Sequence, residues 1–291
     1  MDFNRLLYIL IFVLFALTTN EQCVFEALDQ PNVILIIADD MGYYDPTFTG
    51  GNINTPNLNN LANQGVLFEK FLVQPSCSPS RVSLMTGINS ARCGVTRAMN
   101  CYYTPNILGG KILTKTIAQI ANKFEYNTAT IGKQHYGEHP TDHPNLLGWD
   151  YFYGSIYGAF DYINKIDNCG RYQLEKNGIK VLNDTRYYTR LVGQETINYL
   201  NNVDSSPFFI SVNFFAVHTP IMIETDSSLL KPNVNGQSFT SPYEPKVSRY
   251  QTMLKVMDEE IGNIMKTAPN NTYFIFMSDN GGLERSLLSR Q

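Results

Sequence analysis

The chain has 291 residues, 43% of them hydrophobic, and a formal net charge of −4 at neutral pH. A chain of this length and composition can bury the core of one large domain. The small negative charge and the absence of a long basic run argue against nucleic acid as the main partner.

The first segment has the pattern of a secretory signal peptide, which we expect to span residues 1–20. Arg5 precedes an apolar run, 6–17, that is too short for a comfortable membrane span. A retained signal anchor is the alternative. No later stretch is long and apolar enough to cross a bilayer, so we expect a secretory-pathway protein, lysosomal or extracellular, with no membrane span after signal removal.

Cysteine usage agrees with that pathway. If Cys77 is set aside for chemistry, four cysteines remain, enough for two disulfides in an oxidising compartment, and three pairings are open. These four are Cys23, Cys93, Cys101 and Cys169. N-glycosylation patterns begin at Asn183 and Asn270, although such triplets are also frequent by chance.

The first predicted strand covers residues 32–38, a β-rich apolar run typical of a strand that is buried on both faces. It ends at Asp39 and Asp40. Acidic residues there lie at the carboxyl edge of the sheet, where open α/β sheets place their sites, although they also serve as ordinary helix caps. A compact helix over 55–65 follows, and residues 66–73 predict a second strand.

The next stretch, residues 77–87, has the features of a helix start. Ser78 suits the N-cap and Pro79 suits the first helical position. A group at Cys77 would then lie near unpaired backbone N–H groups, where anions are favoured, and Arg81 can reach back toward it. From these residues alone, the alternative is a buried or disulfide-bonded cysteine beside an ordinary cap.

The rest of the chain alternates strands with helices. Apolar spacing predicts helices at 113–124, 189–200 and 250–264, strands at 128–131, 208–215 and 273–277, and loops at 138–169 and 221–247. This alternation predicts an α/β fold with a large, mostly parallel sheet sandwiched by helices.

Polar residues follow the predicted strands at Lys133, His135, His218, Asp279 and Asn280. Because the carboxyl ends of parallel strands share one edge of a sheet, we expect these residues to meet Asp39 and Asp40 there. Carboxylate and amide oxygens suit Ca²⁺ or Mg²⁺ and suit zinc poorly. Two alternatives remain open, since the Asp-Asn-Gly run is also a good turn and a lone strand-end histidine is usually incidental.

One stretch carries a resemblance to a known family. Residues 77–87 read Cys-Ser-Pro-Ser-Arg-Val-Ser-Leu-Met-Thr-Gly. This run fills every fixed position of the signature of the type I sulfatases, formylglycine-dependent arylsulfatase-like hydrolases of the alkaline phosphatase superfamily. The resemblance covers 31–282. It implies that family's fold, a sulfatase catalytic domain over 31–291, and hydrolysis of aryl or carbohydrate sulfate esters.

The resemblance also implies the nucleophile and the metal. Cys77 would be oxidised by the formylglycine-generating enzyme, and the hydrated aldehyde would attack the sulfur of a sulfate ester. One divalent metal per chain is implied, Ca²⁺ or alternatively Mg²⁺. Its ligands would be Asp39, Asp40, Cys77, Asp279 and Asn280.

Three basic residues acquire roles in the same way. Lys133 and His135 match the family element Gly-Lys-x-His-x-Gly, with Gln134 where tryptophan is common. Lys133 would bind the sulfate and the nucleophile oxygens, and His135 would deprotonate the second hydroxyl of the hydrate. His218, followed by Thr-Pro, matches the sulfate-binding histidine, and Arg81 would add a cation.

The family pattern continues beyond Asp279 and Asn280 with a further sulfate-binding lysine and a small C-terminal domain. This sequence ends at Gln291, and 283–291 contains no lysine. We therefore expect a catalytic domain truncated at its C-terminal end, without the small domain. Two alternatives to the sulfatase follow: a phosphoester or phosphonate hydrolase of the same superfamily, and a truncated, non-catalytic binding form.

Overall fold

The computed structural model describes residues 30–99, 112, 114–137, 140–228 and 247–282. The predicted signal peptide, residues 1–20, and the end of the chain, 283–291, lie outside the described residues. Among the helices of the described part, none combines the length and the apolar character that crossing a bilayer requires.

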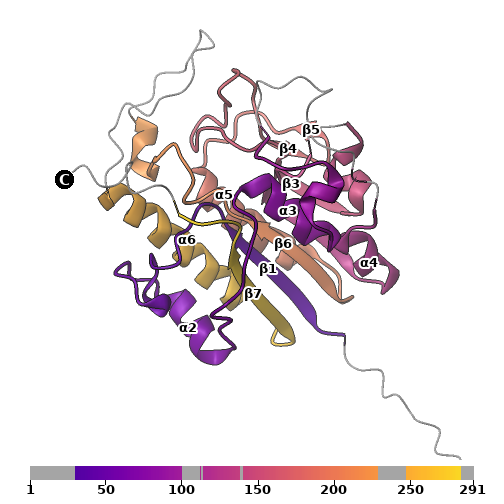
Figure 1. Ribbon diagram of the computed structural model, residues 1–291, viewed down its shortest axis with the longest axis horizontal. Helices are drawn as coiled ribbons and strands as arrows, with labels where there is room; N and C mark the ends of the chain where they lie inside the picture. Colours follow the sequence, from indigo (N-terminus) through magenta and orange to yellow (C-terminus); the bar gives the residue numbers. More distant parts are fainter. Residues whose placement is uncertain (1–29, 100–111, 113, 138–139, 229–246, 283–291) are drawn as a thin grey trace, which may run out of the picture. The chain divides into compact units, whose positions relative to one another are not determined.

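A seven-stranded mixed sheet organises the unit formed by residues 31–291 (Figure 1). Five strands run parallel and two short ones, β4 and β5, run antiparallel at one edge. The order across the sheet is β5-β4-β3-β2-β6-β1-β7. The strands are β1 (Asn32–Ala38), β2 (Asn127–Lys133), β3 (Tyr151–Ser155), β4 (Glu175–Lys176), β5 (Ile179–Lys180), β6 (Phe208–Asn213) and β7 (Thr272–Ser278).

Helices pack on both faces of this sheet (Figure 1). The α-helices are α2 (Pro56–Gln64), α3 (Cys77–Thr86), α4 (Ile117–Lys123), α5 (Tyr188–Asn202) and α6 (Val247–Thr267). Short 3₁₀ turns are η1 (Thr47–Thr49), η2 (Ser90–Cys93), η3 (Pro140–Asp142), η4 (Pro144–Leu147) and η5 (Glu224–Ser228).

Strand β1 shows why both faces must be covered. Successive side chains of a strand point to opposite faces. Ile34 and Ile36 belong to the buried cluster that contains residues of α5 and α6, whereas Leu35 and Ile37 belong to the cluster that contains residues of α3 and α4. The predicted fold, a mostly parallel sheet sandwiched by helices, is therefore confirmed.

Two predicted elements are wrong. Residues 66–73 form no strand and pair with no described strand, although their sequence favours one. Propensity alone does not make a strand, because its backbone groups need a partner in a ladder. Conversely, β3 lies within the predicted loop 138–169, where aromatic residues at Tyr151, Phe152 and Tyr153 pair with β2.

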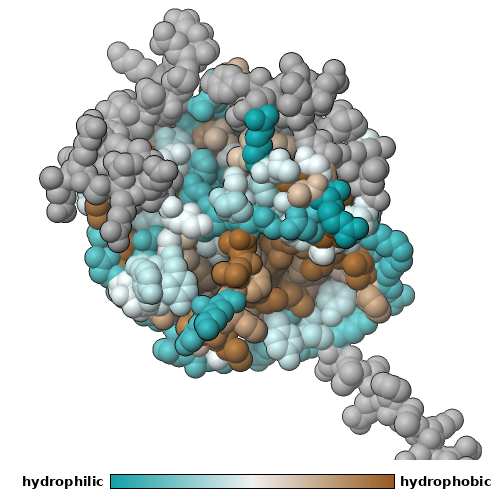
Figure 2. All heavy atoms as spheres, in the orientation of Figure 1, coloured by the Kyte–Doolittle hydropathy of each residue, from teal (hydrophilic) through white to brown (hydrophobic). Residues whose placement is uncertain are grey.

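The segment 66–73 is an exposed apolar stretch. Phe68 is 73% exposed and Leu72 is 92% exposed, and Tyr273 and Ile275 of β7 are exposed as well. Figure 2 shows hydrophobic surface in the region where Figure 1 places β7 and the connection from α2 to α3.

This exposure makes a matched pair of substitutions informative. We expect Leu72→Ala to change the free energy of unfolding by less than about 0.5 kcal/mol, because the side chain loses almost no buried contact. Leu58→Ala, at a position only 1% exposed, should cost about 2–5 kcal/mol. Urea unfolding of both variants checks this, and equal losses would mean that residues 66–73 are buried after all.

The cysteines and glycosylation patterns have mixed outcomes. Cys169 is disulfide-bonded, whereas Cys93 is a free thiol, so the expectation of two disulfides is wrong. Cys23 and Cys101 lie outside the described residues. Asn183 and Asn270 are both exposed.

Candidate active site

The polar residues predicted from the sequence meet at the carboxyl edge of the parallel strands. Backbone hydrogen bonds join the strand ends there: the N–H of Asp39 donates to Ala216 (3.0 Å), and the N–H of Asp279 donates to Ala38 (3.0 Å). Lys133 ends β2 within the same sheet. Three segments that are far apart in the sequence therefore supply one site, as the strand pattern predicts.

Helix α3 brings Cys77 to this edge, but the helix begins earlier than predicted. Its first residue is Cys77 and its N-cap is Ser76, not Ser78. The hydroxyl of Ser78 does not cap the helix. It accepts a hydrogen bond from the N–H of Met99 (3.1 Å) and so ties the segment at Met99 to α3. Cys77 thus lies in the first turn, where unpaired N–H groups favour an anion.

Cys77 and His135 are in direct contact. The sulfur of Cys77 lies 3.1 Å from Nδ1 of His135, and Nε2 of that ring lies 2.8 Å from the carbonyl of Met99. Since a carbonyl only accepts, Nε2 carries a proton, and in the neutral ring Nδ1 is therefore an acceptor that faces the sulfur of Cys77. Gly158 leaves room for the ring, because a Cβ there would lie 2.1 Å from it. His135 is therefore oriented as a base toward residue 77.

Arg81 lies one turn into α3 and is almost fully buried, with 2% exposure. Its Nε donates to Oδ2 of Asp279 (2.8 Å) and its Nη1 donates to the carbonyl of Lys133 (2.7 Å). Its Nη2 has no hydrogen-bond partner among the described residues and lies 4.0 Å from Asp39. The guanidinium group is thus fixed on two sides, and the N–H groups of Nη2 remain for an anion.

Lys133 is completely buried and donates to Oδ2 of Asp39. Burial is the largest single influence on the pKa of Lys133 and lowers it, but the negative charges around it, Asp39 first among them, together outweigh burial and the pKa is raised. Burial, and then repulsion from Asp279, raises the pKa of Asp39. A compact group of buried charges of both signs therefore surrounds Cys77. The charge of Cys77 in turn acts to raise the pKa values of Asp39, Arg81 and Lys133.

Asp40, Asn280 and His218 lie on the more open side of the group. Nδ2 of Asn280 donates to Oδ1 of Asp40 (2.6 Å), and Nε2 of His218 lies 3.6 Å from Oδ2 of Asp40. Burial, followed by the charge of Lys133, lowers the pKa of His218 to about 4. The ring of His218 is therefore neutral at pH 7.

The arrangement fits a hard divalent cation. Oδ1 of Asp39 and Oδ1 of Asn280 are buried acceptors that lack a hydrogen-bond partner within the described part of the chain. Ligand atoms of Asp39, Asp40 and His218 lie within 4.8 Å of one another. A buried, unsatisfied acceptor is costly, and a cation bound between these oxygens would remove that cost.

Some features of the site have no signal in the sequence. The carbonyl of Met99 fixes the tautomer of His135, and a backbone acceptor contributed by a loop leaves no pattern to find. Gln134 accepts from the hydroxyl of Thr130 (2.9 Å) and lies in the protein interior rather than in the site. His143 bonds Glu175 (3.0 Å), away from this group, while His139 lies outside the described residues.

Comparison with known proteins gives a consistent result. The family model described as Sulfatase matches residues 31–286. The chain is 33% identical to arylsulfatase J of Mus musculus over 267 residues, which is 87% of this chain and 43% of that protein. It is 30% identical to N-acetylgalactosamine-6-sulfatase of Rattus norvegicus over 278 residues, 86% of this chain and 50% of that protein. The chain thus spans about half the length of these curated relatives.

Solved structures agree with the fold. The crystal structure of Ps i-CgsB in complex with k-i-k-neocarrahexaose matches with a TM-score of 0.76 and 30% identity, covering 89% of this chain and 60% of that one. The phosphonate monoester hydrolase of Agrobacterium radiobacter matches with a TM-score of 0.56 and 18% identity, covering 86% of this chain and 62% of that one, which shows the fold alone.

Proposed function

The chain belongs to the sulfatase family, whose members are hydrolases, and we propose that it cleaves sulfate from an aryl or carbohydrate sulfate ester. One observation carries the proposal. Cys77, placed in the family signature, contacts a histidine that is oriented as a base, and two buried cations lie beside it. The two oriented cations favour a doubly anchored anion such as a sulfate group.

We propose that Cys77 is converted to formylglycine by a formylglycine-generating enzyme, and that Ca²⁺, with Mg²⁺ as the alternative, is the metal. Asp39, Asp40, residue 77, Asp279 and Asn280 would hold the metal. The modified residue would supply a hydrated aldehyde as nucleophile, and the metal would supply positive charge that lowers its pKa.

The protein's own side chains would then divide the work. Arg81, held by Asp279 and by the carbonyl of Lys133, would present its free Nη2 to a sulfate oxygen. The ammonium group of Lys133 would turn from Asp39 toward the anion once a metal shares that carboxylate. His135 would accept a proton at Nδ1 while Nε2–H stays on Met99.

We propose that His218 holds the substrate near Asp40. Nδ1 of His218 donates to the carbonyl of Thr219, and a ring that also carries a proton at Nε2, the atom facing Asp40, would donate to a sulfate ester oxygen and pass that proton to the leaving alcohol or phenol oxygen. We also propose a secretory-pathway location, lysosomal or extracellular, because the signal-peptide pattern precedes the domain.

A paired substrate test decides the reaction class. Protein made in a formylglycine-competent secretory host should hydrolyse para-nitrophenyl sulfate faster than para-nitrophenyl phosphate. The opposite preference would favour the phosphoester or phosphonate hydrolase, and binding of the sulfate ester without turnover would favour the non-catalytic form.

Calcium should stabilise the folded chain. Saturation at 100 times its dissociation constant should add about 2.7 kcal/mol to the free energy of unfolding. Thermal unfolding after treatment with a chelator, followed by repletion with calcium or with magnesium, measures the effect and the preference. An unfolding temperature that changes with neither ion would contradict the proposed metal site.

A further inference from the structure

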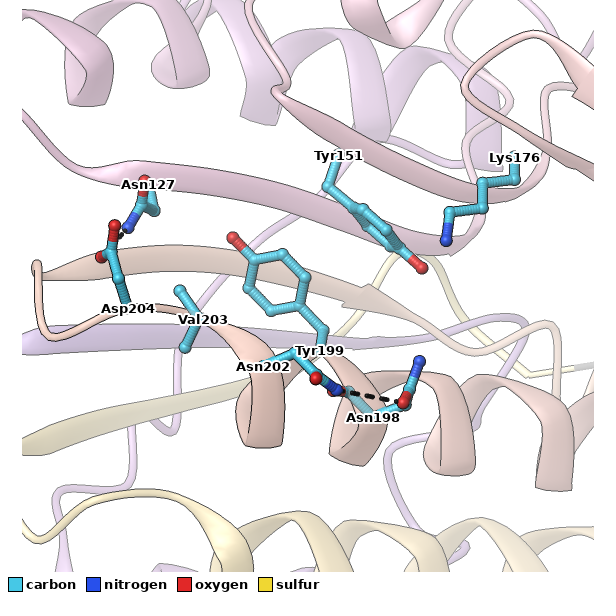
Figure 3. Close-up of a pocket in the computed structure, with 8 residues that line it drawn as sticks. All are labelled: Asn127, Tyr151, Lys176, Asn198, Tyr199, Asn202, Val203 and Asp204. Atoms are coloured by element: carbon cyan, nitrogen blue, oxygen red, sulfur yellow. Dashed lines mark hydrogen bonds between the residues drawn. The ribbon is translucent and has the colours of Figure 1, made fainter.

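A pocket lies away from the candidate active site, at the opposite edge of the sheet, where the parallel strands begin (Figure 3). Its volume of about 560 Å³ falls within the range of small-molecule sites. Strand β2 starts at Asn127, in the pocket, and ends at Lys133, in the active site, so about 20 Å separates the two at roughly 3.3 Å per residue. The pocket is lined by Asn127, Tyr151, Lys176, Asn198, Tyr199, Asn202, Val203 and Asp204.

Two tyrosine rings form the centre of this pocket (Figure 3). The centroids of Tyr151 and Tyr199 are 5.1 Å apart, and the rings are tilted by 50°. The hydroxyl of Tyr151 donates to Oε1 of the buried Glu195, which fixes that ring. Burial, and then the charge of Asp150, raises the pKa of Tyr199 to about 12, so its hydroxyl stays protonated. The rings thus offer a rigid apolar surface with a polar tip.

Amide side chains surround the rings and are already held in place. Nδ2 of Asn127 donates to Asp204 (2.7 Å), and Nδ2 of Asn202 donates to the carbonyl of Asn198 (2.7 Å). Each of these bonds uses a donor and leaves the amide oxygen of Asn127 and of Asn202 to accept from a ligand hydroxyl. Held amides beside aromatic rings match the alternating apolar faces and hydroxyl groups of a sugar.

A lysine side chain, Lys176, lies at the other end of the pocket. The ammonium group of Lys176 lies 5.1 Å from the centroid of Tyr151, and Lys176 forms no ion pair with a described residue. It is exposed and therefore available to a ligand. An unpaired lysine next to a sugar-like surface favours a saccharide that carries an anionic group.

We propose that this pocket binds a sulfate-bearing saccharide chain, with a sugar ring on Tyr199 and Tyr151 and a sulfate group near Lys176. The proposal deepens the proposed function, because it makes a saccharide the class of sulfated substrate, but binding in the pocket requires no turnover at Cys77. Asp204 and the negative net charge disfavour a nucleic acid, whose phosphates are more closely spaced.

Hydrogen exchange locates the binding. The full chain is mixed with a sulfated galactan hexasaccharide of the carrageenan type, and exchange is followed by mass spectrometry. Slower exchange in peptides covering 198–204 and 151–155 supports the proposal. Protection confined to the peptide containing 77–86, or no protection at all, overturns it.

Titration calorimetry of variants tests the chemistry. Tyr199→Ala should weaken binding of the hexasaccharide about tenfold or more, whereas Tyr273→Ala, at an exposed tyrosine of β7, should not. Lys176→Gln should weaken binding of the sulfated chain but not of its desulfated counterpart, and Lys255→Gln, at an exposed lysine of α6, should leave both unchanged. Equal losses in a variant and its control would overturn the proposal.

Failure of the proposed function and failure of the proposed saccharide pocket give different results. Para-nitrophenyl sulfate is too small to reach both sites, so its hydrolysis reports on the active site alone. If the wild-type chain binds the hexasaccharide through this pocket but hydrolyses no aryl sulfate, the proposed function fails and the pocket stands. If it hydrolyses the aryl sulfate and Tyr199→Ala binds the hexasaccharide normally, the pocket fails alone.

Discussion

Replacing Cys77 with alanine should lower the turnover of an aryl sulfate by about 10⁴-fold or more, because the residue that forms the bond to sulfur is removed. Cys77 is buried against His135, in the first turn of α3, and no other described cysteine shares this position. The measurement is the release of para-nitrophenol by protein from a formylglycine-competent host.

Cys93 supplies the matched control. It is the second free thiol of the described residues and lies in η2, where it is half-buried. Cys93→Ala should retain nearly full turnover. If Cys77→Ala and Cys93→Ala are equally active, residue 77 is not the nucleophile.

Cys77→Ser separates attack from release. A serine oxygen can attack sulfur but lacks the second hydroxyl that would expel the sulfate again. We therefore expect at most one equivalent of phenol per chain and a sulfated serine, visible by mass spectrometry. Repeated turnover by this variant would show that an aldehyde hydrate is not required.

Asp39→Asn should produce the largest loss of stability at the site. Asp39 is fully buried and neutralises Lys133, which is also fully buried. Removing one charge of a buried pair leaves the other uncompensated, at a cost of about 3–5 kcal/mol in the free energy of unfolding. Urea unfolding in the presence of a chelator measures this loss without the metal.

Asp40→Asn distinguishes the ion pair from the metal. Asp40 is partly exposed and pairs with no lysine or arginine of the described residues, so its substitution should cost much less in the chelated state. Both variants should lose the stabilisation by calcium. If Asp39→Asn responds to calcium as the wild type does, the carboxylate is not a ligand.

The strand pattern gave most of the architecture, for a physical reason. The run 32–38 is buried on both faces over most of its length and leaves few alternatives to a central strand, whereas 273–277 belongs to the edge strand β7, where Tyr273 and Ile275 are exposed. The polar residues after these strands could be grouped because parallel strands end at one edge. The prediction of a strand over residues 66–73 was wrong, because a strand depends on a pairing partner that a local sequence pattern does not reveal.

The site was predictable to the level of residues but not to that of charge and orientation. The contact of Cys77 with His135 depends on the Met99 carbonyl and on the space left by Gly158. The neutral state of His218 follows from burial and from Lys133, neither of which is visible in the sequence around it. The pocket at Tyr199 joins segments from β2, β3, β4 and α5 that only the folded chain brings together.

The central claim is that residue 77 is converted into the nucleophile. Its most direct test is the mass of the tryptic peptide 71–81, which contains residue 77, from protein expressed in a formylglycine-competent secretory host. We predict the mass of the aldehyde form. A peptide that carries only unmodified Cys77 would contradict the catalytic account of this chain.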